Sequence, residues 1–458
     1  MSLGPVTVFN AGTSAASPQF ATFMPSYILH PCPDMLSAVC GYLLLGSSGN
    51  DSSLTYSQLT ELYELLSANY VEDDAASFRF KYSAEFLQWA LMPPGWHKEW
   101  HVGVRVKSNQ KLVAFIGGAP VTLRVRNAQF KSVEINFLVV HKKLRGKRLA
   151  PVLIKEVTRQ CNLKGIFQAI YTAGVFLPTP VSVCRYYHRL LNVPKLIDVG
   201  FTGLKSGMTV ARMVRLFKLP SAPALAARGL REMEDRDVPE VRAIFNQYMK
   251  KFGMQPVYNA EEVRHLFLSG RGHGDVRQGR REGQVVWAYV VEDPTTHKVT
   301  DFFSFYTLPS TVLGNARHGM LDAAYLFYYG TNVALQSGAE ADGRLKARLN
   351  ELVADALVVA EQAKFDVFNA MTLMDNDLFL SDLKVRLSKL SRLVQRWLMV
   401  CVAVRARRRS SQLLSVQLED IGARRRRCRQ RVRERTRCWH RHALSRWRLN
   451  TQRLYIRM

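Results

Sequence analysis

Residues 134–151, EINFLVVHKKLRGKRLAP, narrow the choice of fold more than any other stretch of this chain. The opening EINFLVV is mostly apolar and β-forming, which predicts a buried strand. The segment after it holds five cations, at Lys142, Lys143, Arg145, Lys147 and Arg148. Ala150 and Pro151 then lead into PVLIKEVTRQC, whose pattern predicts a helix. We therefore expect a strand that runs into a cationic loop sitting on a helix start.

Phosphate is the ligand that best explains this order of elements. The first backbone N–H groups of a helix have no partner within the helix, and the helix dipole adds about half a positive charge there. Arginine and lysine in the loop would neutralise a pyrophosphate or a 3′-phosphate. Arg145-x-x-Arg148-x-Ala150 is a loose form of the pyrophosphate loop of acetyltransferase-type folds, with Arg148 where glycine is usual. A solvated basic loop is the alternative interpretation of the same residues.

Composition and charge describe a globular body followed by a basic tail. The 458 residues are 47% apolar and 22% charged, and the net charge is +27. That length suits two to three domains or one large fused unit. Residues 385–458 hold 22 lysines and arginines against three acids, so most of the positive charge lies in this tail. Nucleic-acid binding is therefore not expected of the body, and would come only from the tail.

The cysteines and the N-terminal residues indicate a reduced, cytoplasmic protein. The seven cysteines follow no disulfide framework and no zinc spacing, so we expect neither a disulfide nor a bound metal. The run MLSAVCGYLLLG has no cationic residues before it and is too short to cross a bilayer. We accordingly expect no transmembrane segment.

Hydrophobic periodicity predicts two successive α+β patterns. The first has a helix in YSQLTELYELLSANYVEDD, a hairpin formed by WHVGVRV and KLVAFIGGAPVTLRV, and a strand in GIFQAIYTAGVFL. A Pro/Ala linker follows at 219–230. The second has a helix in DVPEVRAIFNQYMKKF, a Gly/Arg-rich loop at 269–284, strands QVVWAYVVED and VTDFFSFYTLP, a helix at 350–364 and a strand FDVFNAMTL. Residues 1–50 are aperiodic, and the tail from Val385 shows no strand alternation.

Long motifs, in a fixed order, resemble the glycylpeptide N-tetradecanoyltransferase (N-myristoyltransferase) family. They are NYVEDDAASFRFKYS, FLQWALMPPGWHKEWHVGVRV, EINFLVVHKKLRGKRLAPVLIKEVTR, YTAGVFLPTP, RYYHRLLN, TDFFSFYTLPSTV, AAYLFYY and FDVFNAMTLMDNDLFLSDLK. The resemblance implies an α+β fold in which two acetyltransferase-like (acyl-CoA N-acyltransferase) halves form one saddle-shaped mixed sheet flanked by helices. The implied boundaries are an unmatched leader at 1–54, an acyl-CoA-binding half at 55–218, a peptide-binding half at 219–384 and an unmatched tail at 385–458.

The activity implied is transfer of myristate from myristoyl-CoA to the N-terminal glycine amine of proteins or peptides. Myristoyl-CoA is then a co-substrate, and no tightly bound cofactor or metal is implied. The backbone N–H groups of Phe137 and Leu138 would stabilise the thioester oxyanion, as fixed main-chain donors can. The residues implied to contact the co-substrate are Phe137, Leu138, Val139, Val140, Arg145, Gly146, Lys147, Arg148, Leu149, Ala150 and Pro151. The family usually has cysteine at the position of Val139. The backbone donors do not depend on that side chain.

The resemblance also implies a groove for the glycine end of the substrate. A narrow aromatic channel would exclude a side chain at the first position, and hydroxyl and imidazole groups would orient the amine. The positions that match are Tyr70, Val71, Glu72, Asp73, Phe78, Phe80, Tyr82, Asn136, Thr172, Gly174, Tyr186, His188, Phe201, Tyr306, Ser310, Leu321, Tyr325 and Asn369. Taken singly, an aromatic residue such as Phe80 would be core, and His188 a structural histidine.

The sequence departs from the family at both ends. No Phe-Trp element precedes the first helix, and no Phe-Gly-x-Gly-Asp-Gly loop follows Lys384. The family's base is a C-terminal carboxylate, and the Arg-rich end of this chain does not match it. The abrupt change at Val385 favours a shifted reading frame over an evolved tail. Two other functions stay open: a catalytically impaired acyl-CoA- and peptide-binding homologue, and nucleic-acid binding through the tail.

Overall fold

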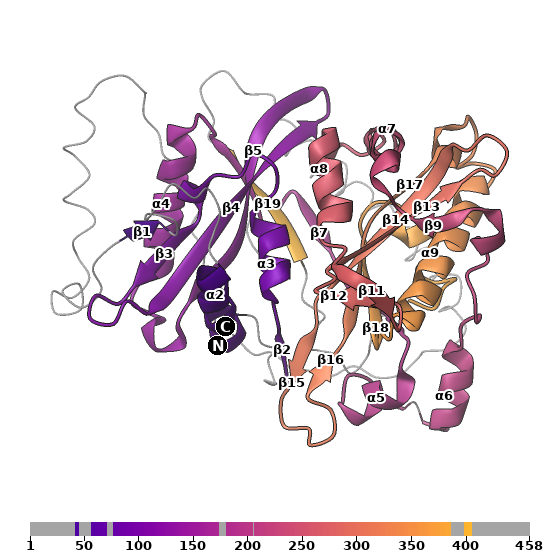
Figure 1. Ribbon diagram of the computed structural model, residues 1–458, viewed down its shortest axis with the longest axis horizontal. Coiled ribbons are helices and arrows are strands. Elements are labelled where there is room, and N and C mark those ends of the chain that lie inside the picture. Colours follow the sequence, from indigo (N-terminus) through magenta and orange to yellow (C-terminus); the bar gives the residue numbers. More distant parts are fainter. Residues whose placement is uncertain are drawn as a thin grey trace, which may run out of the picture. The chain divides into compact units, whose positions relative to one another are not determined.

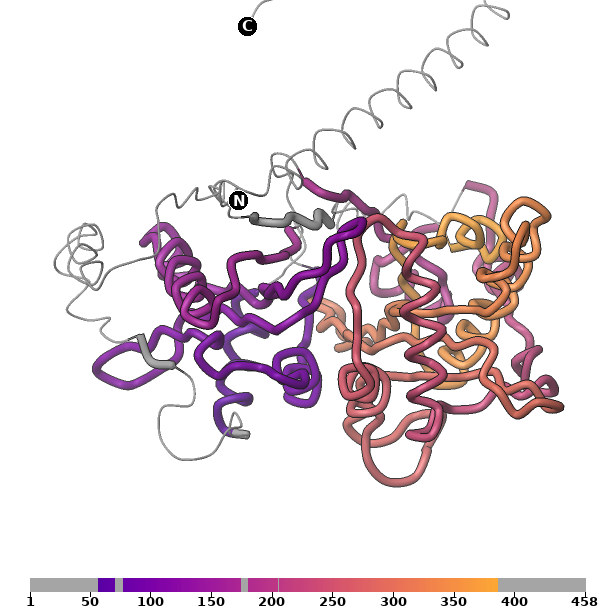
Figure 2. The backbone as a smooth tube through the Cα atoms, turned by 90° about the horizontal axis from the view of Figure 1, so that it is seen from above, coloured from indigo at the N-terminus to yellow at the C-terminus, as the bar shows by residue number. Residues whose placement is uncertain are grey.

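The computed structural model describes residues 42–44, 56–70, 77–173, 180–204, 206–385 and 398–404. Two large sheets dominate these residues, one built mainly from the indigo and purple segments and the other from the orange ones (Figures 1 and 2). The predicted α+β class with mixed sheets is confirmed. Most strands of the first sheet precede Arg185 in the chain, and all strands of the second sheet follow it.

The first sheet has the order β1-β3-β4-β5-β6-β19-β7, and β10 pairs with β4. β5 and β6 are parallel, and the helix α4 (Leu149–Leu163) connects those two strands. Leu153 and Val157 of α4 are buried with Trp100 and Val113 in a cluster on this sheet. The strands are β1 (Tyr42–Leu44), β3 (Val102–Arg105), β4 (Leu112–Val125), β5 (Ala128–Val140), β6 (Gln168–Ala173), β7 (Ser182–Cys184), β10 (Met254–Pro256) and β19 (Leu398–Val404).

The second sheet has the order β8-β18-β17-β14-β13-β9. β17 and β18 are parallel and are joined by α9 (Arg344–Gln362), while their other neighbours are antiparallel. Helices α7 (Val238–Met249) and α9 bury one side each in the largest apolar cluster of the described residues. The strands are β8 (Tyr186–Leu190), β9 (Leu230–Glu232), β13 (Val286–Glu292), β14 (Val299–Thr307), β17 (Ala323–Thr331) and β18 (Val367–Met371).

The remaining elements are short. β2 (Phe78–Phe80), β15 (Ser310–Val312) and β16 (Met320–Leu321) form a small sheet, and β11 (His273–Arg277) pairs with β12 (Arg280–Glu282). The other helices are α2 (Tyr56–Asn69), α3 (Ala84–Leu91), α5 (Val193–Asp198), α6 (Val210–Phe217), α8 (Ala260–Arg264) and a π-helical turn at His265–Ser269. Single 3₁₀ turns lie at Lys98–Trp100, Lys142–Leu144, Ala226–Arg228, Asp235–Asp237, Asn332–Leu335 and Asn376–Leu378.

A third apolar cluster joins the two large sheets and positions the site. It contains Phe115 and Phe137 from the first sheet, Tyr325 and Val367 from the second, and the buried leucines of α2. Burial of this shared cluster makes each sheet depend on the other, because neither covers these side chains alone. The candidate site residues therefore lie among side chains that are fixed from both sides.

Most predicted elements are confirmed, and four stretches differ. The predicted hairpin is β3–β4, and the helix predicted at 350–364 begins earlier, at Arg344. The Gly/Arg-rich stretch at 269–284 is not a loop but contains the β11–β12 hairpin. A strand, β19, occurs in the tail, where no strand was expected, and β1 occurs in the aperiodic leader. Within the described ranges, no helix is long and apolar enough to cross a membrane.

Candidate acyl-transfer site

The strand β5 is interrupted by a β-bulge at Phe137 and Leu138. Val139 pairs with Phe115 and Asn136 pairs with Gly117, so two residues of β5 lie opposite one residue of β4. Phe137 has φ of +57°, in the left-handed region that non-glycine residues rarely adopt. A bulge takes backbone groups out of the ladder and redirects them. The two residues predicted as oxyanion donors are therefore the ones that leave the regular strand.

The Phe137 backbone N–H meets an oxygen atom. It lies on the side of the Tyr70 hydroxyl, just after α2, close enough to lower the pKa of that group. Burial raises the pKa of Tyr70 to about 12, and this N–H partly opposes the rise. The rings of Tyr82 and Phe137 are in edge contact, with centroids 5.4 Å apart. This contact holds the Phe137 side chain in place at the bulge. An N–H that is outside the ladder and aimed at an oxygen is a donor suited to a substrate carbonyl.

The cationic loop is tied to the end of α2. The Lys142 N–H donates to Asn69 Oδ1 over 3.0 Å, and the Arg145 guanidinium donates to the Asn69 carbonyl. Gly146 and Arg148 both have positive φ, at +86° and +59°, so the loop turns twice before the helix. Sequence reasoning missed Asn69, for which the helix-end position of an asparagine was the available signal.

Helix α4 begins at Leu149, two residues before the predicted start at Pro151. Its N-cap residue, Arg148, makes no side-chain capping bond, and the first turn holds no acidic residue. Arg145, Gly146, Lys147 and Arg148 are exposed. The helix start therefore offers uncapped N–H groups beside solvent-facing cations, which is the arrangement that favours a bound phosphate.

His188, Asn369 and Tyr325 form a hydrogen-bonded row across three adjacent strands. Asn369 of β18 pairs with His188 of β8 on one side and with Tyr325 of β17 on the other. His188 Nδ1 lies 2.7 Å from Asn369 Oδ1, and burial raises the pKa of Tyr325, an effect that the Asn369 side chain partly opposes. Burial lowers the pKa of His188 to about 4, against the opposing effect of the Asn369 hydrogen bond. The imidazole is therefore neutral near pH 7.

This row fixes the tautomer of His188. Asn369 Oδ1 can only accept a hydrogen bond, so Nδ1 carries the proton that it donates. Nε2 is then the unprotonated ring nitrogen, which can accept a hydrogen bond. The ring is held by an edge contact with Phe201, at 5.3 Å between centroids. A neutral imidazole in a fixed orientation can position an amine.

Aromatic side chains line the space around this row. Tyr306 stacks on Tyr325 at 5.4 Å, and Tyr186 meets Tyr325 edge-on at 5.9 Å. Burial raises the pKa of Tyr82, Tyr186, Tyr306 and Tyr325, so all four hydroxyls are neutral donors. Phe80 of β2 contacts the Tyr82 ring and pairs with Ser310, which in turn pairs with Leu321. Phe78 contacts Phe201 edge-on.

Glu134 is a buried carboxyl group that sequence reasoning did not single out. It accepts a hydrogen bond of 3.2 Å from Asn136 Nδ2, and both residues point to the same side of β5. Burial raises the pKa of Glu134, and the Asn136 bond opposes this. After burial itself, the charge of Glu134 also raises the pKa of Tyr306 and Tyr328. A glutamate in a mostly apolar strand was the signal that could have identified it.

The structure brings together most of the predicted groove residues. Thr172 lies on β6, beside the part of β5 that holds Asn136. Val71, Glu72, Asp73 and Gly174 lie outside the described residues. Across the described ranges, no group of three or more histidine, cysteine or carboxylate side chains is placed to hold a metal ion.

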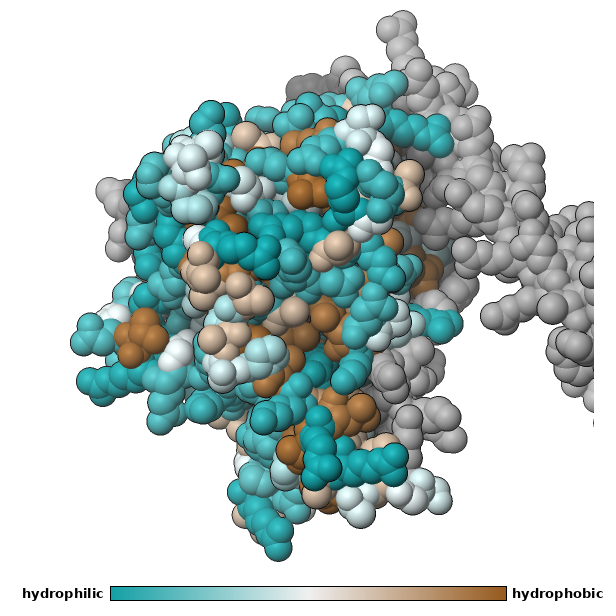
Figure 3. Space-filling model, turned by 90° about the vertical axis from the view of Figure 1, so that its right-hand side faces the viewer, coloured by the Kyte–Doolittle hydropathy of each residue, from teal (hydrophilic) through white to brown (hydrophobic). Residues whose placement is uncertain are grey.

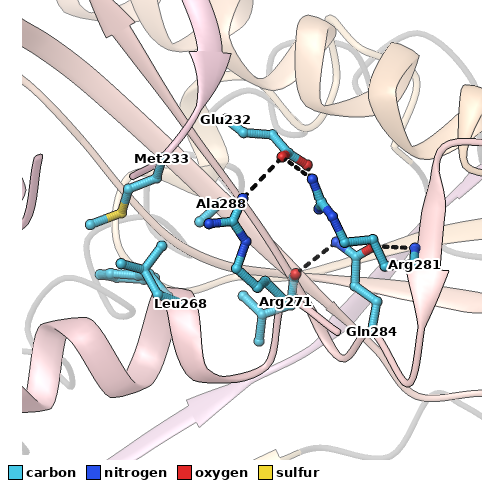
Figure 4. A pocket seen from close by; sticks show the side chains of 9 residues that line it. Glu232, Met233, Leu268, Arg271, Arg281, Gln284 and Ala288 are labelled. Carbon is cyan, nitrogen blue, oxygen red and sulfur yellow. Dashed lines mark hydrogen bonds and ion pairs between the residues drawn. The ribbon is translucent and has the colours of Figure 1, made fainter. Parts of the chain in front are cut away.

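A separate small pocket lies beside the β11–β12 hairpin (Figure 4). Arg281 binds Glu232 through both guanidinium Nη atoms, at 2.9 and 2.5 Å, and Arg271 Nη2 lies 3.5 Å from the same carboxylate. Gln284 accepts a hydrogen bond from the Arg281 N–H. These polar groups satisfy one another, and none of the predicted site residues lines the pocket.

Comparison with known proteins identifies the family. The model described as "Myristoyl-CoA:protein N-myristoyltransferase, N-terminal domain" matches residues 52–184, and the corresponding C-terminal domain model matches residues 198–391. The chain belongs to this family. The family expected from the sequence is thus confirmed. The family models match about the same residues that carried the resemblance.

Relatives and solved structures agree with this assignment. The chain is 52% identical over 353 residues to the glycylpeptide N-tetradecanoyltransferase of Aspergillus fumigatus, covering 77% of this chain and 69% of that protein. It is 52% identical over 325 residues to glycylpeptide N-tetradecanoyltransferase 1 of Arabidopsis thaliana, covering 71% and 69%. The crystal structure of Saccharomyces cerevisiae N-myristoyltransferase with bound myristoyl-CoA aligns with a TM-score of 0.72 at 44% identity, covering 81% of this chain and 84% of that one.

Proposed function

We propose that this protein transfers the myristoyl group of myristoyl-CoA to the N-terminal glycine amine of proteins. The observation that carries the proposal is the bulge at Phe137 and Leu138, which takes backbone N–H groups out of the ladder beside the Tyr70 hydroxyl. A thioester carbonyl oxygen in the place of the Tyr70 hydroxyl would accept hydrogen bonds from the backbone N–H groups of Phe137 and Leu138. Such donors are fixed before charge develops, so they stabilise the transition state more than the ground state.

The phosphate end of the co-substrate is assigned to the same segment. Eleven residues after the bulge, Arg148 leads into the uncapped start of α4, with Lys147 exposed beside it. The segment thus offers donors for a carbonyl at one end and charge for phosphates at the other. We assign Val139, Val140 and residues 145–151 to this co-substrate and residues 55–218 to the acyl-CoA-binding half, because the donors lie there.

The amine of the substrate is assigned to the row formed by His188, Asn369 and Tyr325. The amine nitrogen attacks the thioester carbonyl carbon, the C–S bond breaks, and CoA leaves as a thiolate that takes up the proton lost by the amine. His188 Nε2 would accept a hydrogen bond from the neutral amine and hold its lone pair toward the carbonyl. We expect the ring of Tyr306, which is stacked on Tyr325, to exclude a side chain at the first substrate position.

We also propose roles for the other groove positions. Residues 219–384 supply much of the groove, including Ser310, Leu321 and Asn369, so we propose them as the peptide-binding half. We also propose that the enzyme acts in the cytoplasm, because Cys161 and Cys184 are free thiols and the seven cysteines follow no disulfide spacing. Fractionation of cells that express the tagged chain tests this location.

The product of the reaction tests the proposed function. The chain is incubated with myristoyl-CoA and one of two octapeptides that differ only in an N-terminal glycine or alanine. Mass spectrometry is expected to find a tetradecanoyl group on the glycine peptide alone, on its α-nitrogen. Binding of both ligands without product would instead indicate a non-catalytic acyl-CoA- and peptide-binding protein.

A further inference from the structure

Exposed apolar side chains are concentrated around helix α6. Nine large apolar side chains among the described residues are prominently exposed, and four of them, Leu204, Val210, Val214 and Leu216, lie within residues 204–216. Val210 and Val214 are one turn apart and share a flank of the helix. Scattered exposed apolar residues need no explanation, but a cluster of this kind marks a surface that contacts something.

The same surface is cationic and lacks acids. No aspartate or glutamate occurs between Asp198 and Glu232. Arg212, Arg215 and Lys218 are exposed and form no ion pair with any of the residues that the structure describes. Asp198 itself is contacted by Arg317, at 3.4 Å, and His318, at 3.5 Å, so its charge is countered from the β15–β16 turn.

Helix α6 is firmly seated, so its exposed side is not the result of a loose attachment. Met213 and Phe217 are buried on its inner side. The Arg189 guanidinium donates to the Phe217 carbonyl over 2.9 Å and lies 4.9 Å from the centre of the Phe217 ring. Lys384 Nζ donates to the Leu216 carbonyl over 2.9 Å, which adds a cation near the end of the helix. The outer side is thus presented on a fixed support.

We propose that the α6 surface, defined by Leu204, Val210, Arg212, Val214, Arg215, Leu216 and Lys218, docks onto an anionic lipid bilayer. Apolar side chains next to arginine and lysine, without acids, are the composition of helices that lie in a membrane interface. Lipid phosphates and carboxylates would meet the cations, while the valines and leucines would enter the region below the headgroups. A second copy of the chain is disfavoured, because it would bring the same positive charge to the contact.

The side of the molecule that carries this surface is seen in Figure 3. Hydrophobic residues lie exposed between hydrophilic ones over the lower part of this view, which is where α5 and α6 lie in Figure 1. The groove residue His188 directly precedes Arg189, which holds α6. Docking through α6 would therefore place the groove close to a lipid surface. The proposal does not depend on catalysis by this chain.

Vesicle partitioning of the full chain tests the proposal. The probe is phosphatidylserine–phosphatidylcholine vesicles, with pure phosphatidylcholine vesicles beside them. We compare wild type with V210S/V214S/L216S and with R212E/R215E. The first variant is expected to lower the partition coefficient about tenfold through lost apolar burial. The second is expected to lower it at least about 25-fold, since each cation near an anionic surface contributes roughly fivefold.

Matched controls separate this surface from the rest of the chain. L163S removes another exposed leucine, on α4, and K107E reverses another exposed charge, before β4. Both controls should partition like wild type, and thermal unfolding should confirm that every variant is folded. The basic tail at 385–458 is present in all variants, so its own attraction to anionic lipid is the same in each. Equal partitioning of the α6 variants, the controls and wild type would overturn the proposal.

An acidic protein is the main competing partner, and a further arm addresses it. Wild type that fails to bind phosphatidylserine vesicles but retains poly-glutamate, with loss of that retention in R212E/R215E, would assign the surface to an acidic protein. That outcome also overturns docking onto lipid. Loss of vesicle binding in V210S/V214S/L216S, with poly-glutamate retention unchanged, would support docking onto lipid. Insertion of apolar side chains matters only for the bilayer.

Discussion

The imidazole of His188 and the amide of Asn369 lie opposite each other in the ladder between β8 and β18, with Nδ1 and Oδ1 2.7 Å apart. The two residues are 181 positions apart in the chain. Their contact joins the strand that follows the first sheet to the interior of the second. It fixes both the orientation and the tautomer of the ring that we assign to the substrate amine.

Asn369→Asp should raise the pKa of His188. A carboxylate at hydrogen-bond distance from an imidazole favours the imidazolium, by about one to three pKa units. Asn369→Leu removes the hydrogen bond without adding charge, so in that variant the pKa should stay at or below its value of about 4. NMR titration of the His188 ring protons measures both. An unchanged pKa in Asn369→Asp would mean that the two side chains are not in contact.

Two buried histidines should make the protein less stable in mild acid. Burial lowers the pKa of both His101 and His188 to about 4, whereas an unfolded histidine has a pKa of about 6.5. Between these values only the unfolded state binds the proton, so the free energy of unfolding falls as the pH drops from about 6.5 to about 4. The expected loss approaches roughly 3 kcal/mol per histidine over the whole window.

Denaturant unfolding near pH 7 and near pH 5 measures this loss of stability. His101 stacks on Trp96 at 5.2 Å, so His101→Phe keeps an aromatic ring in that place and removes the titrating group. The double variant His101→Phe/His188→Asn should lose most of the pH dependence. A slope against pH that equals that of wild type would show that other groups control stability in this range.

The bulge at Phe137 should reverse the usual order of glycine and alanine. Both Phe137→Gly and Phe137→Ala lose the ring, at a cost of about 3–5 kcal/mol. Glycine tolerates a φ of +57° that alanine adopts with strain, so Phe137→Gly should be the more stable of the two by about 0.5–1 kcal/mol. At Val139, in the regular part of β5, alanine should be the better replacement. The same order at both positions would rule out the left-handed backbone at Phe137.

The loop before α4 should bind phosphate and not the acyl chain. Lys147→Ala/Arg148→Ala is expected to weaken myristoyl-CoA binding by about 1.5–3 kcal/mol for each charged hydrogen bond lost. Arg145 is left in place because it holds the loop to Asn69. In calorimetry, S-myristoyl pantetheine, which lacks the nucleotide phosphates, should bind the variant and wild type equally. A similar loss with both ligands would assign these residues to loop structure.

Local pattern was enough to predict the main strands and helices, and the order of the motifs was enough to predict the family. β4, β13 and α7 each carry a run or periodicity that only one kind of element satisfies. The β11–β12 hairpin could not be found this way, because every residue of His273–Arg277 is exposed and no apolar alternation results. The hairpin depends instead on glycines with positive φ, Gly279 in its turn and Gly274 at the irregularity within β11.

The sequence suggested candidate members of the site but not their geometry. EINFLVV reads as an unbroken strand, and nothing in it marks Phe137 as left-handed, because the bulge is set by the register with β4. The hydrogen-bonded row of His188, Asn369 and Tyr325 depends on strand order, since β8 and β18 come from distant parts of the chain. The family resemblance identified these residues as candidates. Only the pairing of the strands in the folded sheet brings them together.

The rate at which the CoA thiol is released tests the central claim most directly. The chain is mixed with myristoyl-CoA and a peptide that begins with glycine, and a matched peptide carries an acetyl group on the same nitrogen. Transfer through the Phe137 bulge to the glycine amine predicts that thiol release requires the free amine and stops with the acetylated peptide. No release with either peptide, or equal release with both, would contradict the proposed transfer, since the first shows no turnover and the second shows only thioester hydrolysis.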